Sequence, residues 1–247
     1  MARIDFALSP GRMNAHYEGS YGAAEMEWRR ICAVEKASNL KALLGGRRAS
    51  VGSVLEVGCG TGAVLHEVKR AEIGRTHEGV DLADPNLHAD AHAVAAGITL
   101  REYDGKRLPF PDRSVDLVYA SHVLEHVPDE RSFLAELRRV AAKFVYVEVP
   151  CELHARAGAA QIQKTLDIGH INAYTPESFG LTLVTSGLQN IDLQVFDHRD
   201  EVYLFQTSPL RAKLRMAVRR SLLKTSPFLA SRLFTYHCGA LCAVETP

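Results

Sequence analysis

Hydrophobic positions change their spacing along the first two thirds of the chain. Residues 24–44 carry apolar side chains every three or four positions, and Gly45-Gly46 follows, which predicts a helix that ends there. From Val51 to Val149, short apolar runs alternate with helical stretches. The expected strands are 53–57, 79–81, 99–103, 114–120 and 143–149, and the expected helices are 63–69 and 130–141. This alternation predicts parallel strands joined by right-handed crossovers.

Two of the strand-like runs, Val115–Tyr119 and Phe144–Val147, lack regularly alternating polar residues. Strands covered by helices on both faces typically show such a pattern. We therefore expect an α/β fold with a doubly wound, mostly parallel sheet.

The last hundred residues have a more mixed pattern. A segment rich in Ala, Gly and Gln at 155–163 and a polar loop through His170 are expected, and Thr175-Pro176-Glu177 begins a helix that Gly187 can end. Residues 190–196 and 239–244 indicate strands, and 201–205 is a candidate for another. Every charged residue between positions 210 and 233 is basic, and Leu210, Leu214 and Val218 share one helical stripe. We expect one domain, 1–247, divided into an N-terminal helix or lid (1–50), a cofactor-binding core (51–150) and an acceptor side (151–247) with a basic helical insertion at 208–236.

Composition narrows the class of protein. The 247 residues are 47% hydrophobic and 23% charged, with 29 basic and 29 acidic residues, so no overall positive field attracts nucleic acid. Five scattered cysteines without a C-x-x-C pair favour a reducing, cytoplasmic location. No apolar run approaches the roughly 20 residues that a bilayer requires, and the first residues do not continue into a secretory signal. We expect neither export nor a membrane span.

A glycine-rich turn carries the clearest chemical signal. An apolar strand ends in Glu56-Val57-Gly58-Cys59-Gly60-Thr61-Gly62, and a helix follows. Glycines permit left-handed backbone angles and close approach of a ligand, and the helix N-terminus offers free N–H donors. In an open α/β sheet, ligands bind at the carboxyl ends of the strands. The turn is therefore the expected cofactor site.

Two cofactor types fit this turn. The spacing Gly58-x-Gly60-x-x-Ala63 satisfies the looser dinucleotide fingerprint. Glu56, however, would repel a pyrophosphate and could accept hydrogen bonds from an ammonium group. Asp81 ends the second strand, where an acid can bind ribose hydroxyls in either cofactor. Asp104-Gly105 follows the third strand, in a position to hold an adenine edge.

Together these features resemble the class I S-adenosylmethionine-dependent methyltransferases. The matching stretches are 54–62, 79–82, 104–116 and 118–127, within a region of about 50–150. The resemblance implies S-adenosylmethionine as cofactor and a seven-stranded sheet with an antiparallel last strand. It implies that the turn contacts the methionine part of the cofactor and that the end of the second strand contacts the ribose. The end of the third strand would contact the adenine, and the end of the fourth strand would lie beside the sulfonium. The residues concerned are Glu56, Gly58, Cys59, Gly60, Gly62, Asp81, Leu82, Asp104, Gly105, Ser121, His122 and His126.

The acceptor is less directly indicated. The Asn-Pro-Pro-aromatic segment common in family members that methylate planar amines is replaced by Ala120-Ser121-His122-Val123, which disfavours an amine acceptor. A hydroxyl acceptor needs alignment and a base. The candidate bases are Glu148, His154 and His170, whereas His126 either packs beneath the cofactor or acts as a base. Glu148 could also hold a divalent cation, although no ligand spacing identifies a metal site.

The sequence thus favours methyl transfer to a hydroxyl of a small acceptor. The polar loop 152–172 suits a saccharide, and the chain resembles bacterial saccharide O-methyltransferases. The alternatives are a C-methyltransferase of a quinone or lipid, a non-catalytic binding module and a nicotinamide-dependent oxidoreductase. Segment 208–236 fits a solvated helix face, a contact with a membrane surface or a homodimer interface. Cys238 and Cys242 are expected to be small buried side chains.

Overall fold

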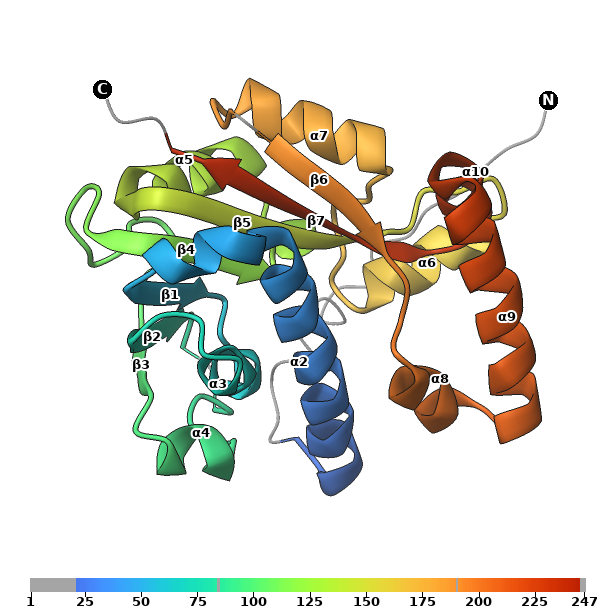
Figure 1. The fold of residues 1–247 in the computed structure, drawn as a ribbon, viewed down its shortest axis with the longest axis horizontal. Helices are drawn as coiled ribbons and strands as arrows, with labels where there is room; N and C mark the ends of the chain where they lie inside the picture. Colours follow the sequence, from blue (N-terminus) through green and yellow to red (C-terminus); the bar gives the residue numbers. More distant parts are fainter. Residues whose placement is uncertain (1–20, 84, 190, 245–247) are drawn as a thin grey trace.

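A seven-stranded sheet forms the centre of the protein, as seen in a computed structural model that describes residues 21–83, 85–189 and 191–244 (Figure 1). The strand order is β3-β2-β1-β4-β5-β7-β6. Neighbouring strands are parallel, except that β7 is antiparallel to both β5 and β6. This confirms the doubly wound, mostly parallel sheet with an antiparallel last strand. The strands are β1 (Ser53–Val57), β2 (Thr76–Asp81), β3 (Thr99–Glu102), β4 (Val115–Ser121), β5 (Ala141–Cys151), β6 (Ile191–Phe196) and β7 (Tyr236–Ala243).

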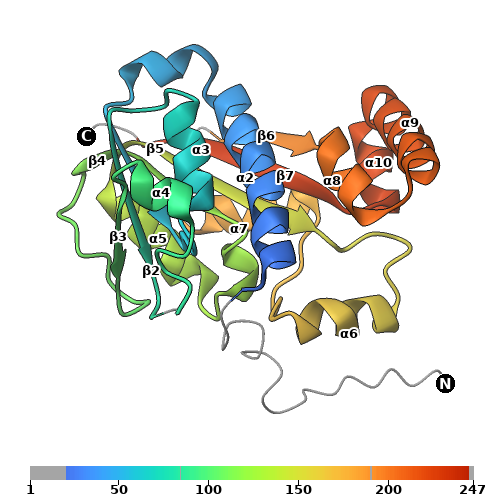
Figure 2. The same ribbon diagram turned by 90° about the horizontal axis from the view of Figure 1, so that it is seen from below.

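Helices cover both faces of the sheet (Figures 1 and 2). Consecutive strand residues point to opposite faces, so Leu117 and Val118 of β4 are both fully buried but belong to different cores. The core containing Leu117 is closed by α2 (Ala23–Leu44), α3 (Ala63–Arg70) and α4 (Ala91–Ala95). The core containing Val118 is closed by α5 (Glu130–Val140) and α7 (Pro176–Thr185). Two-sided burial explains why the central strands lack polar alternation.

The predicted helix boundaries rest on identifiable capping residues. Gly45 ends α2 with φ +49°, and Gly187, with φ +81°, lies just beyond the end of α7. At the start of α7, the Thr175 hydroxyl accepts from the Ser178 N–H at 3.1 Å, and the Ser178 hydroxyl accepts from the Thr175 N–H at 2.9 Å. This reciprocal pair satisfies two N–H groups that have no partner within the helix, with Pro176 as the first helical residue. The predicted helix after residue 175 is confirmed.

Three expectations for the last hundred residues are wrong. Residues 201–205 do not form a strand but lie in α8 (Asp200–Gln206), because acids in the first turn favour a helix and the buried Val202 and Tyr203 are consecutive. Residues 159–167, expected as loop, form α6 (Ala159–Asp167), whose Ala and Gln residues favour helix. The 210–233 run is divided into α9 (Pro209–Thr225) and α10 (Pro227–Leu233). Pro227 forces Ser226 into an extended conformation, with φ −155° and ψ 96°.

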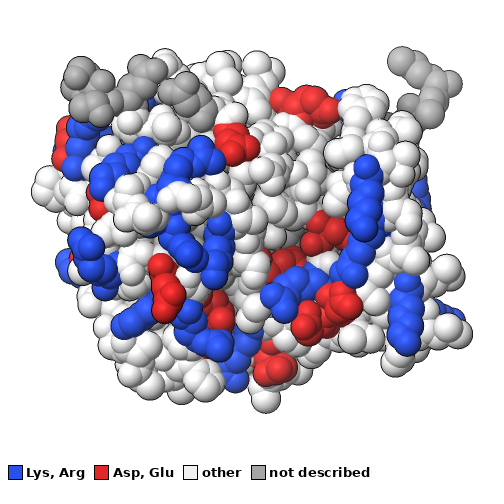
Figure 3. Space-filling model, viewed as in Figure 1, with Lys and Arg blue, Asp and Glu red and all other residues white. Residues whose placement is uncertain are grey.

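The apolar stripe on α9 faces outward. Leu210, Leu214 and Val218 are 81%, 67% and 49% exposed, whereas Met216 is buried against Ala212 and Tyr203. Figure 3 shows Lys and Arg side chains along the same edge of the molecule. The described part of α9 therefore presents apolar and basic side chains together to its surroundings.

The described residues also show the state of the cysteines and whether any helix could cross a membrane. All five cysteines are free, and Cys238 and Cys242 are both fully buried, as expected. Among the described helices, none is long and apolar enough to cross a membrane.

The two faces of α9 should respond differently to truncation. Met216→Ala removes buried apolar contacts and should lower the free energy of unfolding by about 2 kcal/mol, whereas Leu214→Ala should change it by less than about 0.5 kcal/mol. Urea denaturation of both variants measures this difference. A larger loss in Leu214→Ala would show that the exposed face is packed in solution.

Candidate functional site

The glycine turn lies between β1 and α3, at the carboxyl edge of the sheet. Gly58, Gly60 and Gly62 all have positive φ, at +78°, +49° and +83°. The N–H groups of Gly58 and Cys59 donate to the Val80 carbonyl at 2.8 and 3.2 Å, which ties the turn to β2. A Cβ added to Gly58 would lie 2.3 Å from a methyl group of Val123, but one added to Gly60 would have no neighbour within 4 Å. Packing thus requires Gly58, while Gly60 borders open space.

Acidic side chains follow the two strands beyond the turn. The Asp81 carboxylate, at the end of β2, accepts from the N–H groups of Gly60 at 2.5 Å and Leu82 at 2.7 Å. Gly105 has φ +74°, and a Cβ there would lie 2.8 Å from a Leu82 methyl group, so these two residues lie against each other. Asp104 is exposed, and the N–H groups of Arg107 and Lys106 hydrogen-bond its carboxylate and lower its pKa. Both acids are therefore held at the edge of the turn.

Glu56 lies deeper, within β1. Its side chain is only 1% exposed, and its Oε2 has no hydrogen-bond partner among the described residues. Burial raises the pKa of Glu56 to about 8, against the lowering effect of the nearby Tyr119 hydroxyl. The carboxyl group is therefore largely protonated at neutral pH until a cation reaches it.

The end of β4 adds unusual backbone and unpaired polar groups. Ser121 is buried, and its hydroxyl has no hydrogen-bond partner in the described structure. His122 has φ +59°, which is rare for a residue with a side chain, and its N–H donates to the Glu148 carbonyl at 2.8 Å. The His122 ring lies between two carboxylates, 3.4 Å from Glu125 and 3.7 Å from Glu148. Such strain marks candidate functional positions.

Glu148, at the end of β5, is fully buried and connects His122 to the other side of the sheet edge. Its Oε1 accepts from the Asn39 amide at 3.1 Å and lies 3.2 Å from Nδ1 of His237 on β7. Its Oε2 accepts from the Tyr146 hydroxyl at 2.5 Å. The predicted candidate Glu148 is thus surrounded by polar groups rather than open to a substrate.

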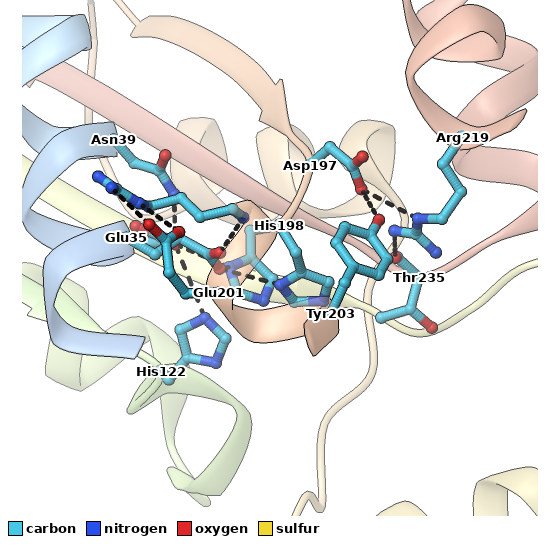
Figure 4. A network of polar contacts seen from close by, with 12 residues as sticks. Glu35, Asn39, His122, Asp197, His198, Glu201, Tyr203, Arg219 and Thr235 are labelled. Carbon is cyan, nitrogen blue, oxygen red and sulfur yellow. Dashed lines mark hydrogen bonds and ion pairs between the residues drawn. The ribbon is translucent and has the colours of Figure 1, made fainter. Parts of the chain in front are cut away.

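Glu35 of α2 extends these contacts to the loop after β6. Its Oε1 lies 3.2 Å from Nδ1 of His237 and 2.9 Å from Nδ1 of His198, while its Oε2 accepts from the Arg199 N–H at 2.6 Å. Figure 4 shows Glu35 and Asn39 of α2 in the same region as His122 and His198. We refer to Glu125, His122, Glu148, His237, Glu35 and His198 as the imidazole–carboxylate chain.

The protonation states in the imidazole–carboxylate chain follow from burial and from the placing of imidazoles next to carboxyl groups. Burial by itself would raise the pKa of Glu125, but the adjacent His122 imidazole lowers it to about 2. Burial likewise opposes ionisation of Glu35 and Glu148, yet neighbouring histidines hold the pKa of each carboxyl below its usual range. Burial lowers the pKa of His237 to about 4. All three carboxylates are therefore ionised at neutral pH, and His237 is neutral.

The pKa of His122 is shifted in the opposite direction to that of His237. Burial and Lys36 would lower the pKa of His122, but Glu125 and Glu148 raise it. His122 is thus the imidazole in the chain whose pKa is shifted toward protonation.

The remaining predicted histidines lie outside the chain. His170 places Nδ1 2.8 Å from Glu152, and its ring meets the His126 ring edge-on at 4.8 Å. Nδ1 of His126 is 3.0 Å from the Gly169 carbonyl, and burial lowers the pKa of His126. Burial, Arg156 and Arg219 lower the pKa of His154, and its Nδ1 has no hydrogen-bond partner among the described residues. Of the three candidate bases, only Glu148 belongs to the chain.

Sequence reasoning missed Glu35, Asn39, His198 and His237. Glu35 and Asn39 gave one usable signal, since both occupy the helical face that otherwise carries buried apolar residues such as Ala37 and Leu40. A buried polar residue on an apolar face needs a partner. Those partners lie more than 100 residues away along the chain, so local spacing could not identify them.

Surface hollows lie at both ends of the sheet. One of about 420 Å³ borders His198 and is lined also by Asp197, Arg199, Asp200, Glu201 and Arg220. Another of about 420 Å³ lies at the amino ends of the strands, beside Val51 and Gly74, away from the glycine turn. The first adjoins the imidazole–carboxylate chain.

Comparisons with known proteins agree with this geometry. Residues 55–146 match the family model described as a methyltransferase domain. The chain is 29% identical over 108 residues to the ajmaline N-methyltransferase of Rauvolfia serpentina, covering 41% of this chain and 36% of that protein. It is 30% identical over 132 residues to a probable tocopherol O-methyltransferase of Oryza sativa, covering 51% and 36%. The chain thus spans about a third of the length of these relatives.

The fold has solved counterparts. The phosphoethanolamine N-methyltransferase 2 of Haemonchus contortus, in complex with phosphomonomethylethanolamine and S-adenosylhomocysteine, aligns with a TM-score of 0.62 and 17% identity. The alignment covers 86% of this chain and 52% of that one. The sheet order and this likeness show a Rossmann-like methyltransferase fold.

Glu56 should make stability depend on pH. An unfolded glutamate has an ordinary pKa of 4.5, and the folded value is about 8. As pH rises between these values, the unfolded state loses its proton first, so the folded state becomes less stable. Glu56→Gln should remove this loss and raise the free energy of unfolding at pH 8, relative to the wild type, by on the order of 2 kcal/mol, with a much smaller gain at pH 5. Chemical denaturation at both pH values measures the effect, and an equal gain at both would refute the assigned cause.

Proposed function

We propose that this protein transfers a methyl group from S-adenosylmethionine to a hydroxyl group of a small acceptor, with a saccharide as the best candidate. One observation carries the proposal: the glycine turn has acids at the ends of β1, β2 and β3, and the imidazole–carboxylate chain begins beside it at β4. The matched methyltransferase domain covers this region, residues 55–146. When bound, S-adenosylmethionine supplies a methyl group activated by a sulfonium.

The residues present fit this cofactor. Glu56 offers a buried carboxylate oxygen without a partner, which can accept from the cofactor's ammonium group. Open space at Gly60 lets a ligand approach the main chain. Asp81, fixed by two backbone N–H groups, can hold ribose hydroxyls, and Asp104 can accept from the adenine amine. The unpaired Ser121 hydroxyl lies at the end of the next strand, on the wall assigned to the sulfonium.

Proton removal from the acceptor falls to His170 in this proposal. Its Nδ1 lies 2.8 Å from the Glu152 carboxylate, which can hold the tautomer that leaves Nε2 free to accept a proton. His170 also lies near Glu125 and His126, next to the β4 end. Glu152 then acts as a positioning residue. Glu148, fully buried and hydrogen-bonded, orients the neighbouring imidazoles, and His154 stays an alternative base.

Surroundings of the site favour a polar acceptor. The segment between β5 and α7, which includes α6, contributes the paired Glu152 and His170, and the hollow beside His198 is lined by charged side chains. Hydroxyl groups of a sugar can exchange hydrogen bonds with such groups. In this proposal residues 51–150 bind the cofactor and residues 151–247 bind the acceptor. The five free cysteines suit the cytoplasmic location that we propose.

A second candidate acceptor is a quinone or lipid methylated at carbon. The outward-facing Leu210 and Leu214 and the basic residues beside them favour it, because an apolar and basic helix face can rest on an anionic membrane surface. The same face could instead meet a second copy of the chain. Assays with labelled cofactor against methyl glycosides and against quinones separate the two acceptor classes.

Cofactor binding is tested through Asp81. Asp81→Asn should weaken binding of S-adenosylhomocysteine at least tenfold in calorimetry, because a neutral amide replaces the charged acceptor for ribose hydroxyls. Asp192→Asn, which removes an exposed surface ion pair with Arg47, is the matched control and should change affinity less than twofold. S-adenosylhomocysteine, and not NADH, should raise the Tm of the wild type. A Tm increase with NADH alone would favour the oxidoreductase alternative, and binding of neither would favour a non-catalytic module.

The base is tested by comparing histidine variants. His170→Ala should lower kcat for a methyl glycoside about 100-fold, with S-adenosylhomocysteine affinity unchanged within about twofold. Glu152→Gln should lower kcat less and shift its pH profile. The exposed His88 provides a control, since His88→Ala should retain full activity. Loss of activity in His154→Ala with a normal His170→Ala would assign the base to His154.

A further inference from the structure

Three side chains from separate parts of the sequence place their ligand atoms together at one end of the imidazole–carboxylate chain. Oε1 of Glu35, on α2, lies 2.9 Å from Nδ1 of His198 and 3.2 Å from Nδ1 of His237. His198 is in the loop after β6, and His237 is in β7. The two imidazole rings meet edge-on with centroids 4.6 Å apart, and all three ligand atoms lie within 4.8 Å of one another.

We propose that Glu35, His198 and His237 bind one divalent transition-metal ion. Two adjacent ligands on the same ion, each about 2.0–2.1 Å from it, are separated by about 2.8–3.4 Å, from octahedral to tetrahedral geometry. The two contacts of Glu35 Oε1, at 2.9 and 3.2 Å, match that spacing. Two imidazoles and one carboxylate are a ligand set that suits Zn²⁺, Fe²⁺ and Co²⁺, and they leave further coordination positions open.

Each oxygen of Glu35 and Glu148 has a hydrogen-bond partner other than His237, and His237 lies between the two carboxylates. Nδ1 of His237 lies 3.2 Å from Glu35 and also 3.2 Å from Glu148, but a single nitrogen carries at most one proton and can donate fully to only one of them. Glu35 is 1% exposed and Glu148 is fully buried. Among the described residues, no Lys or Arg side chain forms an ion pair with either carboxylate. A cation at this point would balance their charge.

Outer contacts hold the ligands in place. The Arg199 N–H donates to Glu35 Oε2 at 2.6 Å, and the Tyr146 hydroxyl donates to Glu148 Oε2 at 2.5 Å. Metal ligands are commonly oriented by such second contacts. Glu148 Oε1 lies 3.2 Å from Nδ1 of His237 but does not belong to the group formed by Glu35, His198 and His237.

Access to the ion is provided from the His198 side. The His198 side chain is 22% exposed, compared with 10% for His237, and it borders the hollow of about 420 Å³. The overlapping group of His122, Glu148 and His237 has a longer contact, 3.7 Å, and shares the same His237 Nδ1. Because these two groups share His237, the geometry points to one ion for them, at Glu35. A third group of possible ligands, Glu125, His126 and His170, shares no residue with this site. If the proposed methyl transfer is correct, an open coordination position on this ion would orient an acceptor hydroxyl.

Metal binding can be measured without an acceptor. The full chain, treated with EDTA and dialysed, is titrated with Co²⁺ while the visible absorption is recorded, and with Zn²⁺ in a calorimeter. We expect one equivalent of either ion per chain, with Kd below about 10 µM, and a rise in Tm on Zn²⁺ addition. Absence of stoichiometric binding of both ions would overturn the proposal.

Variants assign the ligands. His198→Ala, on a partly exposed loop, and Glu35→Gln should each weaken Co²⁺ binding at least tenfold and change its absorption spectrum. His66→Ala is the matched control, because it removes a histidine of similar burial that also lies beside a glutamate and belongs to none of the candidate ligand groups, and it should leave the Co²⁺ titration unchanged. Retained binding in both His198→Ala and Glu35→Gln, or loss in His66→Ala, would refute the assigned site. Far-UV circular dichroism and Tm of each metal-free variant show whether it is folded.

The cofactor proposal is tested separately on the same material. S-adenosylhomocysteine binding to the metal-free protein reports on the glycine turn and does not depend on the ion. Failure of that binding together with a normal Co²⁺ titration would count against the methyltransferase proposal and leave the metal site standing.

Discussion

Backbone pairing of β7 with both β5 and β6 is the constraint on which the candidate site depends. Because β7 runs antiparallel between two strands, its first residues lie at the edge where β5 ends, with His237 opposite Pro150 and Phe196. This pairing brings His237 against Glu148 and lets α2 supply Glu35 and Asn39 from above the same edge. Without the antiparallel insertion, the imidazoles and carboxylates would belong to separate parts of the fold.

Burial of ionisable groups links stability to chemistry at this edge. Glu35, Glu125 and Glu148 are each at most 1% exposed, and burial of a charge is unfavourable unless other groups compensate it. In the chain, hydrogen bonds from neighbouring imidazoles, the Asn39 amide and the Tyr146 hydroxyl provide part of that compensation. Glu56 lacks such a partner, and burial raises the pKa of its carboxyl group to about 8. These acids are therefore suited to different tasks. Glu35, Glu125 and Glu148 stay ionised, whereas Glu56 becomes ionised when a cation approaches.

Local patterns allowed much of the fold to be predicted. The β1 boundaries, Ser53–Val57, match the expected strand, and α5 ends one residue from its expected end, because apolar spacing and capping residues act over a few positions. The helix over Asp200–Gln206 was mistaken for a strand because five residues of mixed pattern fit either form, and neighbouring elements decide. The exposure of Leu210 and Leu214 could not be predicted either, because an apolar stripe on a helix does not indicate whether another element packs against it.

What the sequence determined by itself is the end of the candidate site that we propose for the cofactor. The glycine turn and the acids Glu56, Asp81 and Asp104 come at the ends of successive strands, so their proximity follows from a parallel sheet alone. Tertiary structure alone decided the imidazole–carboxylate chain, which adjoins the hollow that we propose for the acceptor. Glu35 and His198 are 163 residues apart in sequence, and their contact depends on how α2, β6 and β7 pack together. The short-range spacing of apolar residues determines the helices and strands. The contacts between side chains that are distant in sequence form only when those helices and strands pack around a common core.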